Sequence, residues 1–429
     1  MLTRNPTDTT AVRLKSLLET LLQTPLPVRL RAWDGSEAGP AGAPVVVIRH
    51  RRALRRLVWQ PNQLGLARAY VSGDMDVEGD LYDVLTRLAP LLWQAPGVTE
   101  VPLRAAMGEA LRLGIIGSQP KPPPEEMAVT GARHSRGRDR QAIRHHYDVG
   151  NDFYRLVLGE SMVYSCAYWT SDDPGYGLAD AQRDKLDLIC RKLELRPGQR
   201  LLDVGCGWGS LAMHAAKEYG VQVVGITISA EQAAYARKRV DDAGLGHQVE
   251  IRVQDYRELD DGPFDAISSV GMAEHVGTGP YLEYARILYG QLKPGGRLLN
   301  HQISALRHAP EESHQRGFID AYVFPDGELA PVGTTVTLLE RAGFEVRDVH
   351  ALREHYARTL RAWVTNLEAE WSRGVRLTSP GRARVWRLYM AASALAFERA
   401  NIGVNQVLAV KDHRDGTSDM PPTRTSFLA

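Results

Sequence analysis

The sequence predicts an α/β domain in which a mostly parallel sheet is flanked by helices, preceded by a smaller N-terminal α+β domain. Short apolar runs typical of strands alternate with helical segments from residue 184 onward, and such alternation favours a parallel sheet. Gly205, Gly207 and Gly209 follow the first of these runs at alternate positions and directly precede a helix. Residues 119–140 are proline-rich and then basic, with few apolar side chains to bury, so we expect a linker there.

Length and composition are those of an ordinary globular protein. The 429 residues are enough for two or three domains, because one core rarely serves more than about 250 to 300 residues. With 52 basic and 51 acidic side chains the net charge is +1, so we expect no nucleic-acid partner. The three cysteines lack metal-ligand spacing and make a poor disulfide framework, which predicts no metal site and a reducing compartment. No stretch resembles a signal peptide or a membrane span, which favours a cytoplasmic location.

Residues 1–118 are expected to form the N-terminal domain. Residues 13–23 place leucines on one helical face, and two strand-like runs follow before residue 49. Five arginines crowd into residues 49–56, as either a contact for lipid phosphates or a solvated basic face. Leu103, Met107 and Leu111 lie four residues apart in another amphipathic helix, for which packing on the core is favoured over a place on a membrane.

Residues 141–410 are expected to form the larger domain, followed by a polar tail at 411–429. Apolar periodicity predicts a helix over 184–193, which Arg196-Pro-Gly ends before a first strand at 201–204. Further strands are predicted at 221–226, 249–253, 266–270 and 297–300, with helices beginning at 211 and spanning 230–243. Parallel sheets bind ligands at the carboxyl ends of their strands, so the motifs at those ends form the candidate site.

The glycine loop, Asp203-Val-Gly-Cys-Gly-Trp-Gly209, indicates a nucleotide-like ligand. Glycines let the backbone turn sharply and approach a ligand closely, and the helix that follows offers free N–H groups. Dinucleotide-binding loops run G-x-G-x-x-G, whereas the tighter G-x-G-x-G here is similar to the first loop of methyltransferases that bind S-adenosylmethionine (SAM). A glycine turn in another kind of α/β domain is the alternative.

Polar residues follow the next two strands. Thr227, Ser229 and Gln232 stand where most nucleotide-binding α/β folds place an acidic residue for the ribose hydroxyls. Asp255 and Tyr256 offer an acceptor for an adenine amino group and an aromatic face for its ring. Each residue has an alternative role as a helix cap or turn former, but such sites on successive strand ends favour a binding site.

Longer motifs occur in order along the chain: HHYDVGNDFY at 145–154, MVYSCAYW at 162–169, LLDVGCGWGSLA from 201, GITISAEQ from 225, QDYREL from 254, SVGMAEHVG at 269–277 and YVFPDGEL at 322–329. Together they resemble the cyclopropane-fatty-acyl-phospholipid synthase family, from about Arg144 to Ala409. The resemblance implies a class I SAM-dependent methyltransferase fold, which is Rossmann-like. It also implies an enzyme that uses SAM to add a one-carbon unit across cis double bonds in the acyl chains of membrane phospholipids.

The resemblance implies the site residues as well. The expected SAM-binding residues are Tyr164, Ser165, Asp203, Gly205, Gly207, Trp208, Gly209, Thr227, Ser229, Gln232, Asp255 and Tyr256. In the family a bicarbonate ion acts as general base, and its ligands fall here on Cys166, Glu274, His301 and Tyr356. The family also suggests a homodimer formed through the N-terminal domain, which would contact lipid, and peripheral association with the inner face of the cell membrane.

The expected chemistry asks for such residues. An alkene is a weak nucleophile, so its π electrons must attack the sulfonium methyl in a dry, aligned site, and a carbocation results. The aromatic candidates for stabilising this cation are Tyr164, Tyr168, Trp169 and Tyr356. A small anion held by Glu274 and His301 would then remove a proton. Cys166 is not expected to be a nucleophile, and Ser393, where some family members carry cysteine, weakens a thiolate mechanism further.

The product depends on which proton is lost. Loss from the newly added methyl closes a cyclopropane ring, whereas loss after a hydride shift gives an exocyclic methylene group. The stretches RAWDGSEAGP, LGLARAYVSGD, YVFPDGELAP and AFERANIGVNQVLA look more like actinobacterial relatives that make 10-methylene fatty acids, which a flavin- or NADPH-dependent reductase then reduces. Ala273 and Gln302 also depart from the commonest ring-forming pattern. The methylene product is therefore favoured over the ring.

Two other functions stay open. A SAM methyltransferase of a small soluble substrate would act without lipid vesicles. A SAM-binding subunit that is inactive alone and supports a reductase is disfavoured, because Glu274, His301 and Tyr356 are retained.

Overall fold

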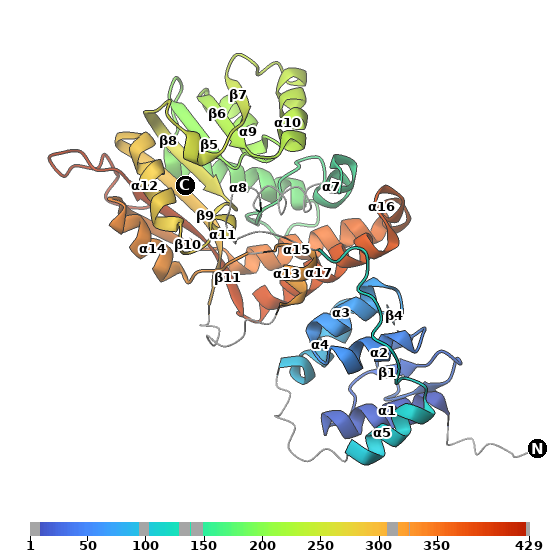
Figure 1. The fold of residues 1–429 in the computed structure, drawn as a ribbon. Coiled ribbons are helices and arrows are strands. Elements are labelled where there is room, and N and C mark those ends of the chain that lie inside the picture. The colour runs from blue at the N-terminus through green and yellow to red at the C-terminus, as the bar shows by residue number, and fades with distance from the viewer. Residues whose placement is uncertain are drawn as a thin grey trace, which may run out of the picture. The chain divides into compact units, whose positions relative to one another are not determined.

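The computed structural model describes residues 9–93, 103–127, 138, 149–306, 316–325 and 327–425. The chain divides into two compact units (Figure 1). The first unit contains residues 1–128, 314–323 and 378–395, and the second contains residues 129–313, 324–377 and 396–429. Two stretches from late in the chain therefore belong to the N-terminal unit. Most of the expected linker at 119–140 lies outside the described residues.

The first unit is an α+β fold around a four-stranded sheet with the order β2-β1-β3-β4. Strands β1 and β3 are parallel, and the other pairs are antiparallel. Its elements are α1 (Thr10–Leu22), β1 (Arg29–Arg31), β2 (Glu37–Ala38), β3 (Val45–Ile48), α2 (Arg52–Trp59), α3 (Gln63–Val71), β4 (Met75–Glu78), α4 (Leu81–Trp93), α5 (Leu103–Arg112), α13 (Phe318–Tyr322) and the first part of α17 (Pro380–Glu398). Leu14 and Leu17 of α1 are buried in the core of this unit, as the leucine periodicity predicts.

The arginine cluster at residues 49–56 is engaged within the unit. Arg52 and the buried Arg56 both bind the Asp74 carboxylate, at 3.0 and 3.1 Å. The other three contact Asp76, the Trp33 ring and a backbone carbonyl. These contacts favour a structural role over a lipid-phosphate contact.

The α5 helix corrects an expectation. Met107 and Leu111, expected to pack on the core, are 54% and 61% exposed. The side chain of Leu103 lies outside the described residues. The buried apolar side chains come later, at Leu113 and Ile115. Glu109 of α5 pairs with Arg13 of α1 at 2.6 Å.

The second unit contains a seven-stranded sheet with the order β10-β11-β9-β8-β5-β6-β7. Its strands are β5 (Arg200–Val204), β6 (Gln222–Thr227), β7 (Val249–Val253), β8 (Phe264–Val270), β9 (Leu292–Ala305), β10 (Glu345–Ala351) and β11 (Ile402–Val410). The first five are parallel, and β11 is antiparallel to both β9 and β10. This architecture confirms the predicted fold class.

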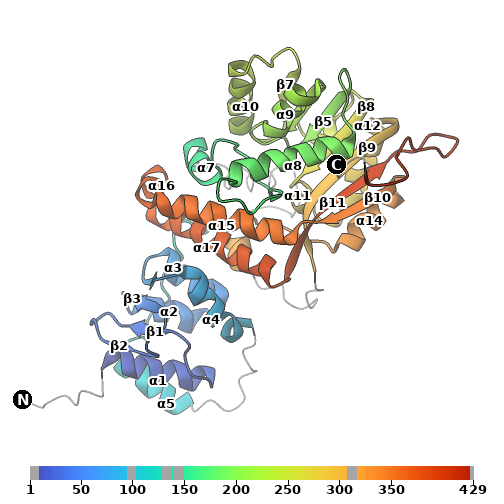
Figure 2. The same cartoon turned by 180° about the vertical axis from the view of Figure 1, so that it is seen from behind.

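Helices cover both faces of this sheet (Figures 1 and 2). One face packs against α8 (Leu178–Leu193), α9 (Ser210–Tyr219) and α10 (Ala230–Asp242), and the other against α11 (Ala273–Val276), α12 (Tyr281–Gln291) and α14 (Val332–Arg341). Successive residues of β5 serve the two faces in turn, with Leu201 in the first core and Leu202 in the second. The remaining helices are α7 (Asn151–Leu158), α15 (Arg353–Ala369), α16 (Trp371–Leu377) and the 3₁₀ turn η1 (Tyr256–Glu258).

In the part of the chain that the structure describes, no helix is long and apolar enough to cross a bilayer.

Candidate functional site

The glycine loop has the conformation that its sequence predicts. Gly205, Gly207 and Gly209 have φ values of +78°, +54° and +80°, a region that side chains with a Cβ rarely adopt. A Cβ on Gly205 would lie 2.5 Å from the Met272 sulfur, so only glycine fits there. Gly209 caps α9, and its Cα packs so close to Ala236 of α10 that an added Cβ would lie 3.2 Å from the alanine Cβ.

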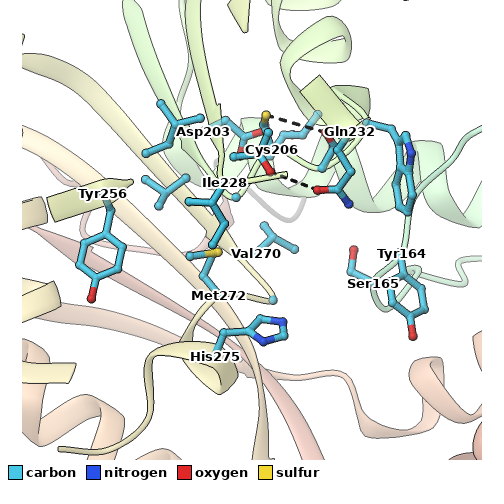
Figure 3. A pocket seen from close by; sticks show the side chains of 18 of the residues that line it. Tyr164, Ser165, Asp203, Cys206, Ile228, Gln232, Tyr256, Val270, Met272 and His275 are labelled. Atoms are coloured by element: carbon cyan, nitrogen blue, oxygen red, sulfur yellow. Dashed lines mark hydrogen bonds between the residues drawn. The ribbon is translucent and has the colours of Figure 1, made fainter. Parts of the chain in front are cut away.

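A cavity of about 180 Å³ lies at the carboxyl ends of β5, β6, β7 and β8 (Figure 3). All but two of the expected SAM-binding residues line it, the exceptions being Gly209 and Ser229. Ser229 instead caps α10, where its hydroxyl accepts a hydrogen bond from the Gln232 backbone N–H at 3.3 Å. Figure 3 shows Tyr256 at one end of the pocket and Tyr164 with Ser165 at the other.

The polar groups at the Tyr256 end are already paired. The Asp255 carboxylate accepts two hydrogen bonds from the Arg257 guanidinium, at 2.7 and 2.8 Å, and the same guanidinium lies over the Tyr256 ring. The Thr227 hydroxyl donates to the Gln232 amide oxygen at 3.1 Å. These bonds hold the side chains in place before any ligand enters.

Two buried charged groups also line the pocket. Lys185 of α8 is 2% exposed, and its Nζ donates to the Ser165 hydroxyl at 2.9 Å. Asp203 is also 2% exposed and accepts from the Ser268 hydroxyl at 2.7 Å. Burial lowers the pKa of Lys185 to about 8 and raises the pKa of Asp203 to about 6.

Sequence reasoning missed Lys185, together with Met272 and His275, which also line the pocket. A signal for Lys185 exists. Ala181, Lys185, Leu188 and Lys192 are spaced four, three and four residues apart, so both lysines share the buried face of α8.

None of the four expected bicarbonate ligands lines this cavity. His301 lies on β9, and the other three are linked by hydrogen bonds to β9 or β11. His301 pairs with Val270 across β9 and β8, and its carbonyl accepts from the Gly271 N–H at 2.8 Å. Val270 and Gly271 both line the cavity. His301 therefore lies one strand away from the SAM pocket.

A series of hydrogen bonds links Glu274 to β9, and Tyr356 and Cys166 to β11. The Glu274 carboxylate accepts from the Ile303 N–H at 2.7 Å, two residues beyond His301 on β9. Ile303 pairs with Val404 of β11, whose carbonyl accepts from the Leu352 N–H at 2.9 Å. The Leu352 carbonyl in turn accepts from the Tyr356 N–H and from the Cys166 thiol, at 3.1 and 3.6 Å.

Glu274 and His301 each present a buried polar atom without a hydrogen-bond partner among the described residues, namely Glu274 Oε2 and His301 Nε2. Burial raises the pKa of Glu274 to about 7 and holds the pKa of His301 well below its ordinary value. The other ring nitrogen of His301, Nδ1, lies 3.3 Å from the Gln406 amide nitrogen. Unpartnered buried atoms call for an explanation, and a bound ion, a water molecule or a catalytic role can each supply it.

Cys166 is buried, and its Sγ also lies 3.2 Å from the Ala167 carbonyl. Burial raises the pKa of its thiol, so the group stays neutral and is a poor nucleophile.

A continuous run of aromatic rings connects the SAM pocket with Tyr356. Neighbouring ring centroids lie 4.7 to 6.1 Å apart along Trp208, Tyr154, Tyr164, Trp363, Tyr356 and Phe397. Sequence reasoning assigned roles to Trp208, Tyr164 and Tyr356. It quoted the stretches that contain Tyr154 and Phe397 without giving either residue a role, and it did not single out Trp363. This aromatic wall excludes water and offers π faces to positive charge.

Two of the aromatic rings expected to stabilise the carbocation pack against other side chains. The Arg358 guanidinium lies 4.7 Å from the centre of the Trp169 ring, and the indole N–H donates to the Thr359 hydroxyl. Tyr168 packs against His355 with a centroid distance of 5.0 Å. A cation on Trp169 would meet the positive charge of Arg358, which makes this ring a poorer candidate than Tyr164 or Tyr356. The expected role of Trp169 stays a prediction.

The two residues that bear on the product lie on the far side of β9. Gln302 follows His301, so its side chain points to the opposite face of the sheet, where it donates to the Thr335 hydroxyl at 3.0 Å. Ala273 and Gln302 line a separate small cavity there. Ser393 belongs to the part of α17 in the first unit.

The pocket fits SAM. Asp203 Oδ2 is buried without a hydrogen-bond partner among the described residues, as suits a ligand ammonium group. Gly205 leaves the backbone open to close approach, and Asp255 with Tyr256 offers the acceptor and the ring face that adenine needs.

Comparison with known proteins agrees with this geometry. The family described as mycolic acid cyclopropane synthetase matches residues 134–407. A probable fatty acid methyltransferase of Mycobacterium tuberculosis is 42% identical over 409 residues, covering 92% of this chain and 93% of that protein. The cyclopropane-fatty-acyl-phospholipid synthase of Escherichia coli is 38% identical over 312 residues, covering 72% of this chain and 78% of that protein.

A solved structure shows the same fold. The mycolic acid cyclopropane synthase CmaA1, in complex with S-adenosylhomocysteine (SAH) and CTAB, superposes with a TM-score of 0.59 and is 34% identical. The match covers 63% of this chain and 97% of that chain. The chain therefore belongs to the mycolic acid cyclopropane synthetase family and is a SAM-dependent transferase of one-carbon groups.

Proposed function

We propose that this enzyme alkylates the cis double bond of an unsaturated acyl chain, such as oleoyl, in a membrane phospholipid, and that the product carries a 10-methylene branch. The observation that carries the proposal is the pair of unpartnered buried atoms, Glu274 Oε2 and His301 Nε2, on or bonded to the strand next to the SAM pocket. A pocket for a polar soluble substrate would have no use for the aromatic wall.

SAM, when bound, supplies an electrophilic methyl carbon on a positively charged sulfur. The rings of Tyr164 and Tyr356 would keep water from the carbocation that the attacking double bond leaves behind, and their π faces would stabilise its charge. Tyr164 lines the SAM pocket itself, so the wall begins where the methyl group is transferred.

Glu274 and His301 would hold a small anion, such as bicarbonate, that takes the proton. With a pKa of about 7, a large fraction of Glu274 is protonated near neutral pH and can donate an O–H hydrogen bond to an anion. We assign the His301 tautomer that accepts from Gln406 at Nδ1, so that its Nε2–H also donates. Cys166 and Tyr356 complete the proposed anion site.

Two hydrogen-bond donors that point to one place suit an anion, which can accept from both. Of the two possible products, we favour the methylene branch because RAWDGSEAGP, LGLARAYVSGD, YVFPDGELAP and AFERANIGVNQVLA look more like the actinobacterial relatives that make it. Ring closure is the alternative.

We also propose that the enzyme acts as a homodimer at the inner face of the cell membrane and passes its product to a flavin- or NADPH-dependent reductase. Exposed apolar side chains on the N-terminal unit support membrane contact: Val58, Trp59, Met107 and Leu111 are each at least half exposed.

The test incubates purified protein with SAM and vesicles of oleoyl phospholipid, followed by mass spectrometry and ozonolysis of the fatty acids. The proposal expects a gain of one CH₂ per modified chain and a ketone after ozonolysis, whereas a ring survives ozonolysis. SAM turnover without vesicles, on a soluble substrate, contradicts the lipid assignment.

A further inference from the structure

Lys185 is a buried cation whose recorded partner is a neutral hydroxyl. Its side chain is 2% exposed, its Nζ binds Ser165 Oγ at 2.9 Å, and it forms no ion pair with any residue that the structure describes. An ammonium ion in such a place is costly unless an anion compensates it. Lys192 lies two turns further along α8 and shows the usual compensation of a buried charge. It is fully buried, and its ammonium group pairs with the Asp348 carboxylate at 3.1 Å.

Asp203, a buried acidic group in the same pocket, also lacks a partner, among the residues that the structure describes, for part of its side chain. One carboxylate oxygen accepts from Ser268, and the other, Oδ2, is buried without a partner among the described residues. Lys185 and Asp203 both line the cavity, so a ligand there meets one buried positive and one buried negative group. The ligand part that carries both charges on one carbon is an α-amino acid.

We infer that Lys185, together with the Ser165 hydroxyl, binds the α-carboxylate of the methionine part of SAM, while Asp203 binds its α-ammonium group. The position agrees with the orientation of the pocket, since Ser165 lies at the end opposite Tyr256 (Figure 3). Adenine at Tyr256 leaves the amino-acid part of the ligand at Ser165 and Lys185. Lys185 is thus a cofactor-binding residue, and this assignment holds whichever substrate the enzyme methylates.

The test compares two ligands by isothermal titration calorimetry. SAH carries the amino-acid part, and 5′-methylthioadenosine lacks it. Lys185→Met keeps the chain length and removes the charge, so it should weaken SAH binding about ten- to a hundredfold, the usual range for a charge-assisted hydrogen bond, and leave methylthioadenosine binding unchanged. The matched control is Lys192→Met on the same helix, which should leave the ratio of the two affinities unaltered.

Equal weakening of both ligands by Lys185→Met would show that the lysine only supports the pocket, and would overturn the inference. So would unchanged SAH affinity combined with lost turnover, because the lysine would then serve an anion at the reaction centre. The comparison of the two affinities does not depend on the lipid assay, so the inference can fail or hold independently of the proposed substrate.

A measurement on the unaltered protein covers the case in which Lys185→Met does not fold. At about pH 8.5, where much of Lys185 is neutral in the free protein, SAH should bind with uptake of roughly half a proton, seen as a dependence of the binding enthalpy on the buffer. Methylthioadenosine should bind without uptake. Equal proton uptake for both ligands contradicts a carboxylate contact.

Discussion

The two sides of the active region differ in how far their polar groups are satisfied. On the adenosine side, Asp255 is bound by Arg257, and Thr227 is bound to Gln232. On the reaction side, Glu274 Oε2 and His301 Nε2 have no partner among the described residues. The difference supports the proposal that the first side is shaped in advance to position the cofactor, whereas the second side needs a bound group to complete its hydrogen bonding.

The largest expected effect comes from breaking the reaction side. Glu274→Gln keeps the size of the side chain and removes its proton chemistry, so turnover should fall about 10²- to 10⁴-fold. SAH affinity should stay within about twofold, since Glu274 does not line the cavity. Steady-state kinetics and calorimetry on the same preparation measure both. Unchanged turnover would instead show that Glu274 takes no part in the reaction.

A smaller effect is expected from disturbing the cofactor side. Gly205→Val places a Cβ 2.5 Å from the Met272 sulfur at a φ of +78°, so SAH affinity should fall about ten- to a hundredfold. Gly198→Val is the matched control, because its φ is +84° and nothing lies within 4 Å of its Cβ position. It should lower the melting temperature without changing affinity, and equal affinity losses in both variants would refute the steric argument.

The pH dependence of stability sharpens the contrast. Burial raises the pKa of Glu274 from 4.5 to about 7, so the folded state favours the protonated form. Its stabilising contribution is full below 4.5 and is lost as the pH rises through about 7. The glutamine of Glu274→Gln does not titrate. As the pH rises from about 5 to about 8, the free energy of unfolding of the variant should therefore rise by about 1–3 kcal/mol relative to that of the unaltered protein. Urea unfolding at both values measures this, and a constant difference would contradict a buried carboxylic acid.

The smallest effect is expected from Gln406, which acts through His301. Gln406→Leu removes the bond to Nδ1 and lets the other tautomer form, so kcat should fall about tenfold with KM for SAM unchanged. Asn405→Leu on the next residue of β11 is the control, since Asn405 binds Ser304 on the opposite face of the sheet. If both variants lose the same activity, the strand and not the tautomer is responsible.

The parts of the fold that sequence reasoning predicted are those with local signals. Strands β5 to β8 and the glycine loop are encoded by short apolar runs and closely spaced glycines, and the structure confirms them. Strands β10 and β11 were missed, although β11 stands beside β9 and supplies Gln406. Its position between β10 and β9 depends on pairing with strands far away in the sequence, which no local period reveals.

The candidate site divides in the same way. The residues at successive strand ends, such as Asp203 and Asp255, could be placed in one pocket because parallel strands share an edge. Lys185 and Trp363 were missed. The spacing of buried positions on α8 carried a signal for Lys185, whereas a tryptophan in a long helix is not distinctive until the fold buries it. The arginine that covers the Trp169 ring comes from α15, so no local pattern near Trp169 reveals that contact.

The contrast between the two sides is tested most directly by measuring SAH affinity and turnover together in Asp255→Asn and Glu274→Gln. Asp255→Asn should weaken SAH binding and leave the turnover of saturated enzyme nearly unchanged, whereas Glu274→Gln should abolish turnover and leave SAH binding unchanged. If affinity and turnover fall in parallel in both variants, the two sides are not separate, and the division of labour proposed for them is wrong.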